Sequence, residues 1–136
     1  MVFSSSPLFP NSKSNILKYD NKKFKKNPVN NTFNLIGKRF TIMILYIMMT
    51  SQKEIRFNQL LNSVEELGPK TLSKRLKEME KNMLIKRTVH TETPIVIGYS
   101  LTEKGKAVRP ILELMAAFSI KYCAKDIFHD LKSNSP

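Results

Sequence analysis

Residues 68–82 read GPKTLSKRLKEMEKN, and the rest of the predicted fold is organised around this segment. Pro69 suits the first position of a helix, because its missing N–H costs nothing there and its fixed φ fits. Leu72, Leu76 and Met79 recur at positions i, i+4 and i+7, so one side of the helix is apolar. The opposite side carries lysines at positions 70, 74, 77 and 81. The stretch therefore predicts a helix with one buried side and one basic side.

The basic side of this helix has two interpretations. Lysines opposite leucines are found on any soluble amphipathic helix, where they only face water. Alternatively, the side chains presented outward near the helix N-terminus fit a nucleic-acid groove. Those side chains are Lys70, Thr71, Ser73, Lys74 and Lys77. The segments on either side of the helix favour the second interpretation.

A shorter helix is predicted just before this one. Phe57, Leu60, Leu61 and Val64 repeat at positions i, i+3, i+4 and i+7, which predicts a helix of about ten residues. The sequence Leu-Gly-Pro at residues 67–69 then turns the chain. A helix, a short turn with glycine, and a second helix with a basic outer side form the helix-turn-helix arrangement.

The period changes after the basic helix. Residues 84–90 are rich in branched side chains, residues 91–94 form a turn, and residues 95–101 alternate apolar with other residues. Two short strands around a tight turn predict a β-hairpin, which in this position is a wing. Arg87 and His90 place positive or titratable groups on it. A short strand is also expected at residues 54–56.

Two helices are predicted before the helix-turn-helix. Pro28 opens a helical pattern in which Val29, Phe33 and Ile36 are spaced i, i+4 and i+7, and Gly37 is a plausible stop. Residues 40–49 are apolar nearly all round, which predicts a central helix that is buried on most sides.

The last predicted helix extends from residue 103 to about residue 128, with Thr102 as its N-cap. Pro110 should kink this helix or join two helices. Beyond it lie two apolar sides, and we expect one to pack on its own domain and the other on the same helix of a second subunit. The alternative is that both sides are covered within one chain. The predicted dimer-interface residues are Ile111, Met115, Phe118, Ile120, Tyr122 and Cys123. Cys123 is either a small packing residue or an interface thiol.

The predicted fold class is mainly α with a small β-hairpin (α+β), a winged helix-turn-helix with additional N- and C-terminal dimerisation helices. The predicted domains are a basic N-terminal arm at residues 1–27, the DNA-binding domain with its dimerisation helix at residues 28–130, and a tail at residues 131–136.

Composition narrows the class of partner. The 136 residues include 23 Lys and Arg against 11 Asp and Glu, a formal charge of +12, which favours a polyanionic partner. A single cysteine excludes an intramolecular disulfide framework and fits a reducing cytosol. The longest apolar run is too short to span a bilayer, and no signal-peptide pattern is present. We therefore expect a cytoplasmic protein without a membrane partner.

Catalytic and metal-binding patterns are weak. Two histidines, His90 and His129, and one cysteine give no metal-ligand spacing. Four glycines in the chain form no phosphate-binding loop. We therefore expect no enzyme activity, no metal and no cofactor.

Five stretches in order and spacing carry a resemblance to a known family. They are NLIG at residues 34–37, RFNQLL at 56–61, PKTLSKRLKEME at 69–80, LIKR at 84–87, and YSLTEKG at 99–105 followed by Pro110. Over roughly residues 28–128 the chain resembles the HxlR-type winged helix-turn-helix transcription regulators. The resemblance implies a homodimer, paired through its N- and C-terminal helices, on pseudo-palindromic operators. The family often carries a cysteine thiol sensor directly before the Pro-Val of the first helix, but Asn27 stands there in this chain.

The sequence thus predicts a sequence-specific DNA-binding regulator that acts as a homodimer. The predicted DNA-binding residues are Lys38, Arg39, Arg56, Lys70, Thr71, Ser73, Lys74, Lys77, Arg87 and His90. Two rival hypotheses remain: a winged helix whose basic side meets an acidic protein, and a protein that coats DNA regardless of sequence. The sequence leaves open the operator, the direction of regulation and any small-molecule effector.

Overall fold

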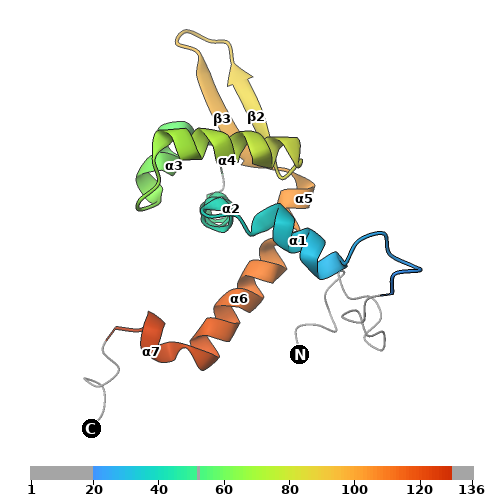
Figure 1. Cartoon of the computed structure of the whole chain (residues 1–136). Helices are drawn as coiled ribbons and strands as arrows, with labels where there is room; N and C mark the ends of the chain where they lie inside the picture. The colour runs from blue at the N-terminus through green and yellow to red at the C-terminus, as the bar shows by residue number, and fades with distance from the viewer. Residues whose placement is uncertain (1–19, 52, 130–136) are drawn as a thin grey trace. The chain divides into compact units, whose positions relative to one another are not determined.

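The computed structural model describes residues 20–51 and 53–129 (Figure 1). The chain divides into two compact units, residues 1–37 and residues 38–136. The described part of the second unit contains six of the seven helices and all three strands. Mostly helical structure with a small antiparallel sheet confirms the predicted fold class.

The first unit contains helix α1 (Pro28–Ile36), with the bounds that Pro28 and Gly37 predicted. The Asn27 side-chain oxygen caps this helix, because it accepts hydrogen bonds from the backbone N–H of Val29 at 2.9 Å and Asn30 at 3.2 Å. Residues 20–27 form turns in front of the helix. Residues 1–19 of the predicted basic arm lie outside the described residues, and the predicted boundary at residue 27 stays a prediction.

The second unit is built on helices α2 (Thr41–Thr50), α3 (Phe57–Ser63) and α4 (Pro69–Lys81). Leu72, Leu76 and Met79 of α4 are buried, so the predicted apolar side of this helix is confirmed. Helix α3 is shorter than predicted, because it ends at Ser63 and Val64 is its cap. Glu66, at φ 63°, turns the chain between the two helices. The predicted helix-turn-helix is thus present.

Helix α2 is buried on most sides, as predicted, and exposed on one. Ile44 and Leu45 are completely buried, as expected for a central helix. However, Met43 and Tyr46 are 47% and 54% exposed. Apolar side chains nearly all round the helix predicted burial on most sides, and this is confirmed, with one side of α2 left exposed within the single chain.

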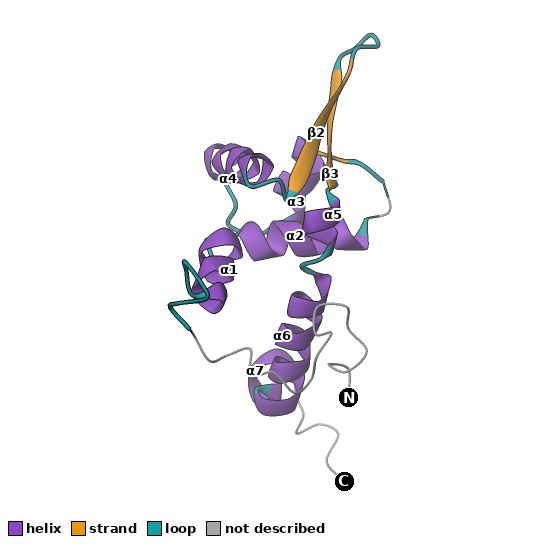
Figure 2. Ribbon diagram, turned by 90° about the vertical axis from the view of Figure 1, so that its right-hand side faces the viewer, coloured by secondary structure: helices purple, strands orange, loops and turns teal. Residues whose placement is uncertain are grey.

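The three strands form an antiparallel sheet in the order β1–β3–β2. Strands β2 (Ile85–His90) and β3 (Val96–Leu101) pair from Ile85 opposite Leu101 to His90 opposite Val96. Strand β1 (Ile55–Arg56) pairs with β3 through Ile55 opposite Tyr99. The β2–β3 hairpin extends beyond α3 and α4 in both ribbon views, which confirms the predicted wing (Figures 1 and 2).

The short helix α5 (Glu103–Lys106) fastens the end of α4 to the start of the wing. The Thr102 backbone N–H donates to the Leu84 carbonyl at 3.1 Å, and the Thr102 hydroxyl donates to the Met83 carbonyl at 2.5 Å. The same hydroxyl accepts the Gly105 N–H at 3.0 Å. Gly105 is buried, and a Cβ atom built on it would clash with the Leu84 carbonyl oxygen. Only a residue without a side chain allows this close approach.

The predicted C-terminal helix is divided more than Pro110 indicated. It consists of α5, α6 (Arg109–Tyr122) and α7 (Ala124–Ile127). Pro110 lies in the first turn of α6, so the first break comes before it, and a second break falls at Cys123. Helix α6 runs away from α2 in both views (Figures 1 and 2). Leu112 is its only buried residue, so the expectation that one whole apolar side packs on its own domain was wrong.

Candidate nucleic-acid interface

The outer side of α4 carries the lysines that the sequence placed there. Lys70, Lys74, Lys77 and Lys81 are exposed. Thr71 and Ser73 are partly buried, so they are presented less fully than predicted. No acidic residue lies in the first turn of this helix. The side of α4 that faces solvent therefore carries lysines along the whole length of the helix.

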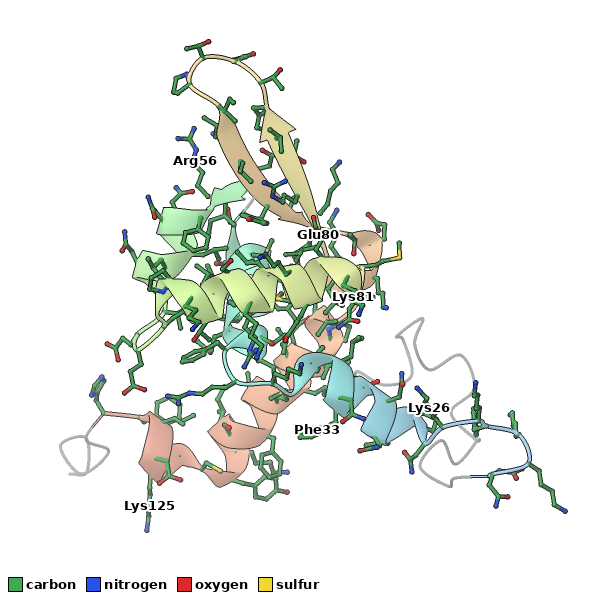
Figure 3. The ribbon with its side chains drawn as sticks, turned by 45° about the horizontal axis from the view of Figure 1, so that its top comes forward. Lys26, Phe33, Arg56, Glu80, Lys81 and Lys125 are labelled. Carbon is green, nitrogen blue, oxygen red and sulfur yellow. The ribbon has the colours of Figure 1, made fainter. Side chains whose placement is uncertain are left out.

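Further positive charges flank α4. Arg56 on β1 and both Lys86 and Arg87 on β2 are exposed. Figure 3 shows Arg56 beside the wing and Lys81 at the C-terminal end of α4. Cations of α4, β1 and β2 thus lie on the helix-turn-helix and on the adjoining wing.

Helix α4 is held in place by a network that we call the α4 brace, formed by Lys38, Arg39, Arg75 and Glu78. Arg75 Nε donates to the Arg39 carbonyl at 2.8 Å, and Arg75 Nη1 donates to Glu78 at 3.3 Å. Lys38 Nζ lies 3.2 Å from the other Glu78 oxygen. The Arg75 side chain is only 16% exposed. The brace therefore joins the middle of α4 to the residues just before α2.

The charge state of Glu78 fits its place in the brace. Burial raises the pKa of Glu78, but the hydrogen bond from Lys38 and the positive charges of Lys38 and Arg75 together outweigh it. The net result is a pKa below the usual glutamate range. Glu78 therefore stays ionised and available to both cations at neutral pH.

Two predicted DNA-binding residues have acidic partners within the chain. Lys38 contacts Glu78, and Arg39 contacts Glu66 at 2.9 Å. The Arg39–Glu66 pair joins residues 27 positions apart, a separation at which the sequence pattern carries no pairing signal. The roles of Glu66 and Glu78 and the hydrogen bonds of Arg75 were therefore not predicted.

Replacing Arg75 with methionine will lower the free energy of unfolding by about 1–3 kcal/mol, because the Arg39 carbonyl loses its side-chain donor and Glu78 keeps only Lys38 of its two cations. Urea denaturation followed by circular dichroism measures this loss. The matched control is Lys77→Met on the same helix, which should stay within about 0.5 kcal/mol because Lys77 is exposed. Equal losses in the two variants would contradict the brace.

His90 also has a partner inside the chain. Its Nε2 atom lies 2.6 Å from a carboxylate oxygen of Glu54, the residue before β1. The hydrogen bond with His90, helped by the charges of His90 and Lys86, lowers the pKa of Glu54. This pair ties the distal end of β2 to the start of β1. His90 was predicted to contact DNA, whereas in the structure it contacts Glu54 at the edge of the sheet.

The carboxyl group of Glu54 will therefore titrate below the usual glutamate range, and His90→Ala will move the midpoint back up. Because the folded-state pKa is lowered, the stabilisation is present above the ordinary pKa and is lost as the pH falls through the lowered pKa. Carbon-13 NMR of the side-chain carboxyl groups measures both midpoints. An unchanged midpoint in His90→Ala would show that the hydrogen bond is not the cause.

Metal-binding clusters and membrane-spanning helices were also sought among the residues that the structure describes. Among residues 20–51 and 53–129, no group of three or more His, Cys, Asp or Glu side chains is arranged to hold a metal ion. In the same residues no single helix is long and apolar enough to cross a membrane, and α1 and α2 reach that length and composition only when taken together.

A three-helix core with a helix-turn-helix and a β2–β3 wing defines the winged helix-turn-helix class of folds. The pattern of the HxlR-like helix-turn-helix family matches residues 35–127, and the chain belongs to this family. The resemblance seen in the sequence is thereby confirmed.

Named relatives agree with the family assignment. The chain is 36% identical over 91 residues to the HTH-type transcriptional regulator YodB of Bacillus subtilis, covering 67% of this chain and 80% of YodB. It is 35% identical over 100 residues to an HTH-type transcriptional regulator of Halalkalibacterium halodurans, covering 74% of this chain and 88% of the relative.

Solved structures of two regulators have the same fold. The reduced form of YodB from B. subtilis aligns with a TM-score of 0.63 and 34% identity, covering 69% of this chain and 90% of YodB. The reduced form of the redox regulator HypR aligns with a TM-score of 0.65 and 27% identity, covering 74% of this chain and 95% of HypR. Both alignments cover most of the length of the solved structure.

Proposed function

We propose that this DNA-binding transcriptional regulator acts as a homodimer that places α4 of each subunit in a major groove, with the β2–β3 wing alongside. The observation that carries the proposal is the row of exposed lysines on the solvent side of α4, next to a wing that also carries exposed cations. A two-fold dimer with this geometry reads half-sites about one or two helical turns apart.

The contacts divide into backbone and base contacts. Lys74 and Lys77, with Lys70, meet phosphates or guanine edges, while Thr71 and Ser73 reach base edges from their partly buried positions. Arg56 and Arg87 add phosphate contacts from the sheet. For Lys38, Arg39 and His90 a DNA contact requires leaving an acidic partner, so we rank these residues second. Since the exposed side of α4 carries no Asn or Gln, DNA shape supplies part of the specificity.

The homodimer is supported by apolar side chains that the chain leaves exposed. Phe118 and Tyr122 on α6 are 61% and 67% exposed, and their rings lie 5.3 Å apart. Met115 and Ile120 are also exposed on this helix, while Ile111 and Cys123 are partly buried. Contiguous exposed apolar surface marks an interaction site. We assign it to the α6 helix of a second subunit, with α1 taking part through exposed Phe33.

Replacing Phe118 with glutamate will separate the subunits without unfolding them, because this side chain is exposed within one subunit. Sedimentation gives the mass, and circular dichroism reports the fold. The matched control is Ala117→Glu, which adds the same charge on the side of α6 that carries Glu113 and Lys121. A Phe118→Glu protein that still sediments as a dimer would remove α6 from the interface.

The remaining assignments follow from this function. We place the protein in the cytoplasm with the chromosome, with no enzyme activity and no cofactor. Residues 1–27 act as a basic arm, residues 28–130 as the DNA-binding and dimerisation domain, and residues 131–136 as a tail. Asn27 occupies the position of the family's thiol sensor and caps α1 instead, so we propose no thiol sensing at that site.

The experiment that tests the function measures binding across a salt series to two DNA duplexes. One has a random sequence, and the other comes from the region upstream of the gene that encodes this protein. A regulator shows a steep loss of affinity with salt, because lysines that neutralise phosphates release counterions. Preference for the upstream duplex supports a specific, autoregulating protein. Steep salt dependence without preference leaves either a DNA-coating protein or an operator located elsewhere, and equal competition by every duplex sequence favours the DNA-coating protein. Absence of duplex binding at low salt refutes the proposal and favours the protein-interaction module.

A further inference from the structure

A cavity of about 530 Å³ lies at the edge of the sheet, between α2, β1, β3, α5 and the start of α6. Its walls include residues of β3, which belongs to the wing, and the first residue of α6, the helix with the exposed apolar side. The volume lies within the range of small-molecule sites in proteins, which is about 300–1,000 Å³. No residue that we assign to DNA contact or to the dimer interface lines this cavity.

The inner wall of the cavity is apolar and adaptable. Met48 and Ile55 are buried at 4% and 8% exposure, and Met49, Tyr99 and Leu101 are partly buried beside them. Thioether side chains fit irregular apolar shapes and make favourable contacts with aromatic rings. The Tyr99 ring offers a surface for offset stacking. This wall therefore suits a flat apolar or aromatic group.

The rim of the cavity is positively charged. Lys53, Lys106 and Arg109 line it, with Glu54 as the one acidic side chain. The Glu54 carboxylate is already bound by His90 at 2.6 Å. Lys106 and Arg109 contact Glu103 and Glu113 at 3.4 and 3.7 Å, but all four side chains are more than 60% exposed. Exposed pairs of this kind contribute little, so both cations can turn to a ligand at small cost.

We propose that this cavity binds a small aromatic carboxylate, with the ring against Met48 and Tyr99 and the carboxylate between Lys106 and Arg109. A neutral ligand would leave the cations unused. A nucleotide or sugar phosphate is disfavoured, because the lining has no glycine-rich loop of backbone N–H groups and its inner wall is apolar. The proposal goes beyond the proposed function and does not depend on DNA binding.

Methyl NMR of the full-length protein, labelled with carbon-13 at the methionine methyl groups, tests the site. The probe is naphthalene-2-carboxylate, and its control is naphthalene-2-carboxamide, which has nearly the same shape without the charge. The carboxylate should shift the Met48 and Met49 signals saturably and leave the exposed Met83 and Met115 unchanged. The amide should bind at least about tenfold more weakly, because charge-assisted hydrogen bonds are lost.

Variants locate the charge. Lys106→Gln with Arg109→Gln should weaken carboxylate binding about tenfold and keep the fold, since both side chains are exposed. The matched control, Lys121→Gln with Lys125→Gln, removes two charges outside the cavity lining and should change nothing. Unshifted Met48 and Met49 signals, equal binding of the amide, or unchanged binding by the Lys106/Arg109 variant would each overturn the proposal.

Discussion

Replacing Gly105 with alanine will lower the free energy of unfolding by at least about 2 kcal/mol, although alanine favours a helix by about 1 kcal/mol over glycine. The added Cβ atom would clash with the Leu84 carbonyl oxygen and would lie 3.1 Å from a Leu101 methyl group. Leu84 is fully buried, and its carbonyl also accepts the Thr102 N–H, so the backbone cannot move away without losing that hydrogen bond.

Chemical denaturation measures the free energy of unfolding of the Gly105→Ala variant and of its control, Gly68→Ala. A Cβ atom on Gly68 would meet nothing within 4 Å, and its φ of −87° suits any residue. Alanine there should cost less than about 1 kcal/mol, through weaker capping of α4. If Gly105→Ala were as stable as Gly68→Ala, the close approach of α5 to the start of β2 would be wrong.

Replacing Lys74 and Lys77 together with alanine will weaken binding to duplex DNA at low salt by about tenfold or more. Both side chains are exposed on the solvent side of α4, where we place phosphate contacts. Each lost phosphate contact removes about 0.9 from the slope of log affinity against log salt, so the slope should fall by nearly two. Fluorescence anisotropy across a salt series measures affinity and slope together.

The control for this pair removes equal charge from another part of the same unit. Lys121→Ala with Lys125→Ala lowers the net charge by the same two units on α6 and α7. A general loss of charge would then weaken binding in both double variants, whereas a groove contact affects only Lys74 and Lys77. Unchanged affinity and slope in the Lys74/Lys77 variant would refute α4 as the DNA-contacting helix.

Local sequence patterns correctly predicted the buried side of α4, the bounds of α1 and the strand β3. The apolar spacing of Leu72, Leu76 and Met79 fixed which side of α4 is buried. Pro28 and Gly37 gave the bounds of α1, because the proline needs no N–H at a helix start. Alternation at residues 95–101 predicted strand β3 and its pairing with β2. These features depend on neighbours along the chain, which a sequence displays directly.

Features that depend on distant residues could not be predicted. Pro110 indicated a break in the C-terminal helix, but proline is tolerated in a first helical turn, so the break precedes it. The second break, at Cys123, has no proline or glycine to signal it. The ion pairs of Lys38 and Arg39 join segments that only the fold brings together. The DNA contacts and the subunit interface remain predictions.

If the exposed apolar side of α6 forms the dimer interface, operator binding depends on the concentration of this protein in the cell. If two subunits must meet before two half-sites can be bound, the dimer fraction falls on dilution, and operator occupancy rises with nearly the square of subunit concentration. The apparent melting temperature should likewise increase with protein concentration. A cell could therefore obtain a steep regulatory response from modest changes in synthesis, with no ligand and no change in the DNA sequence.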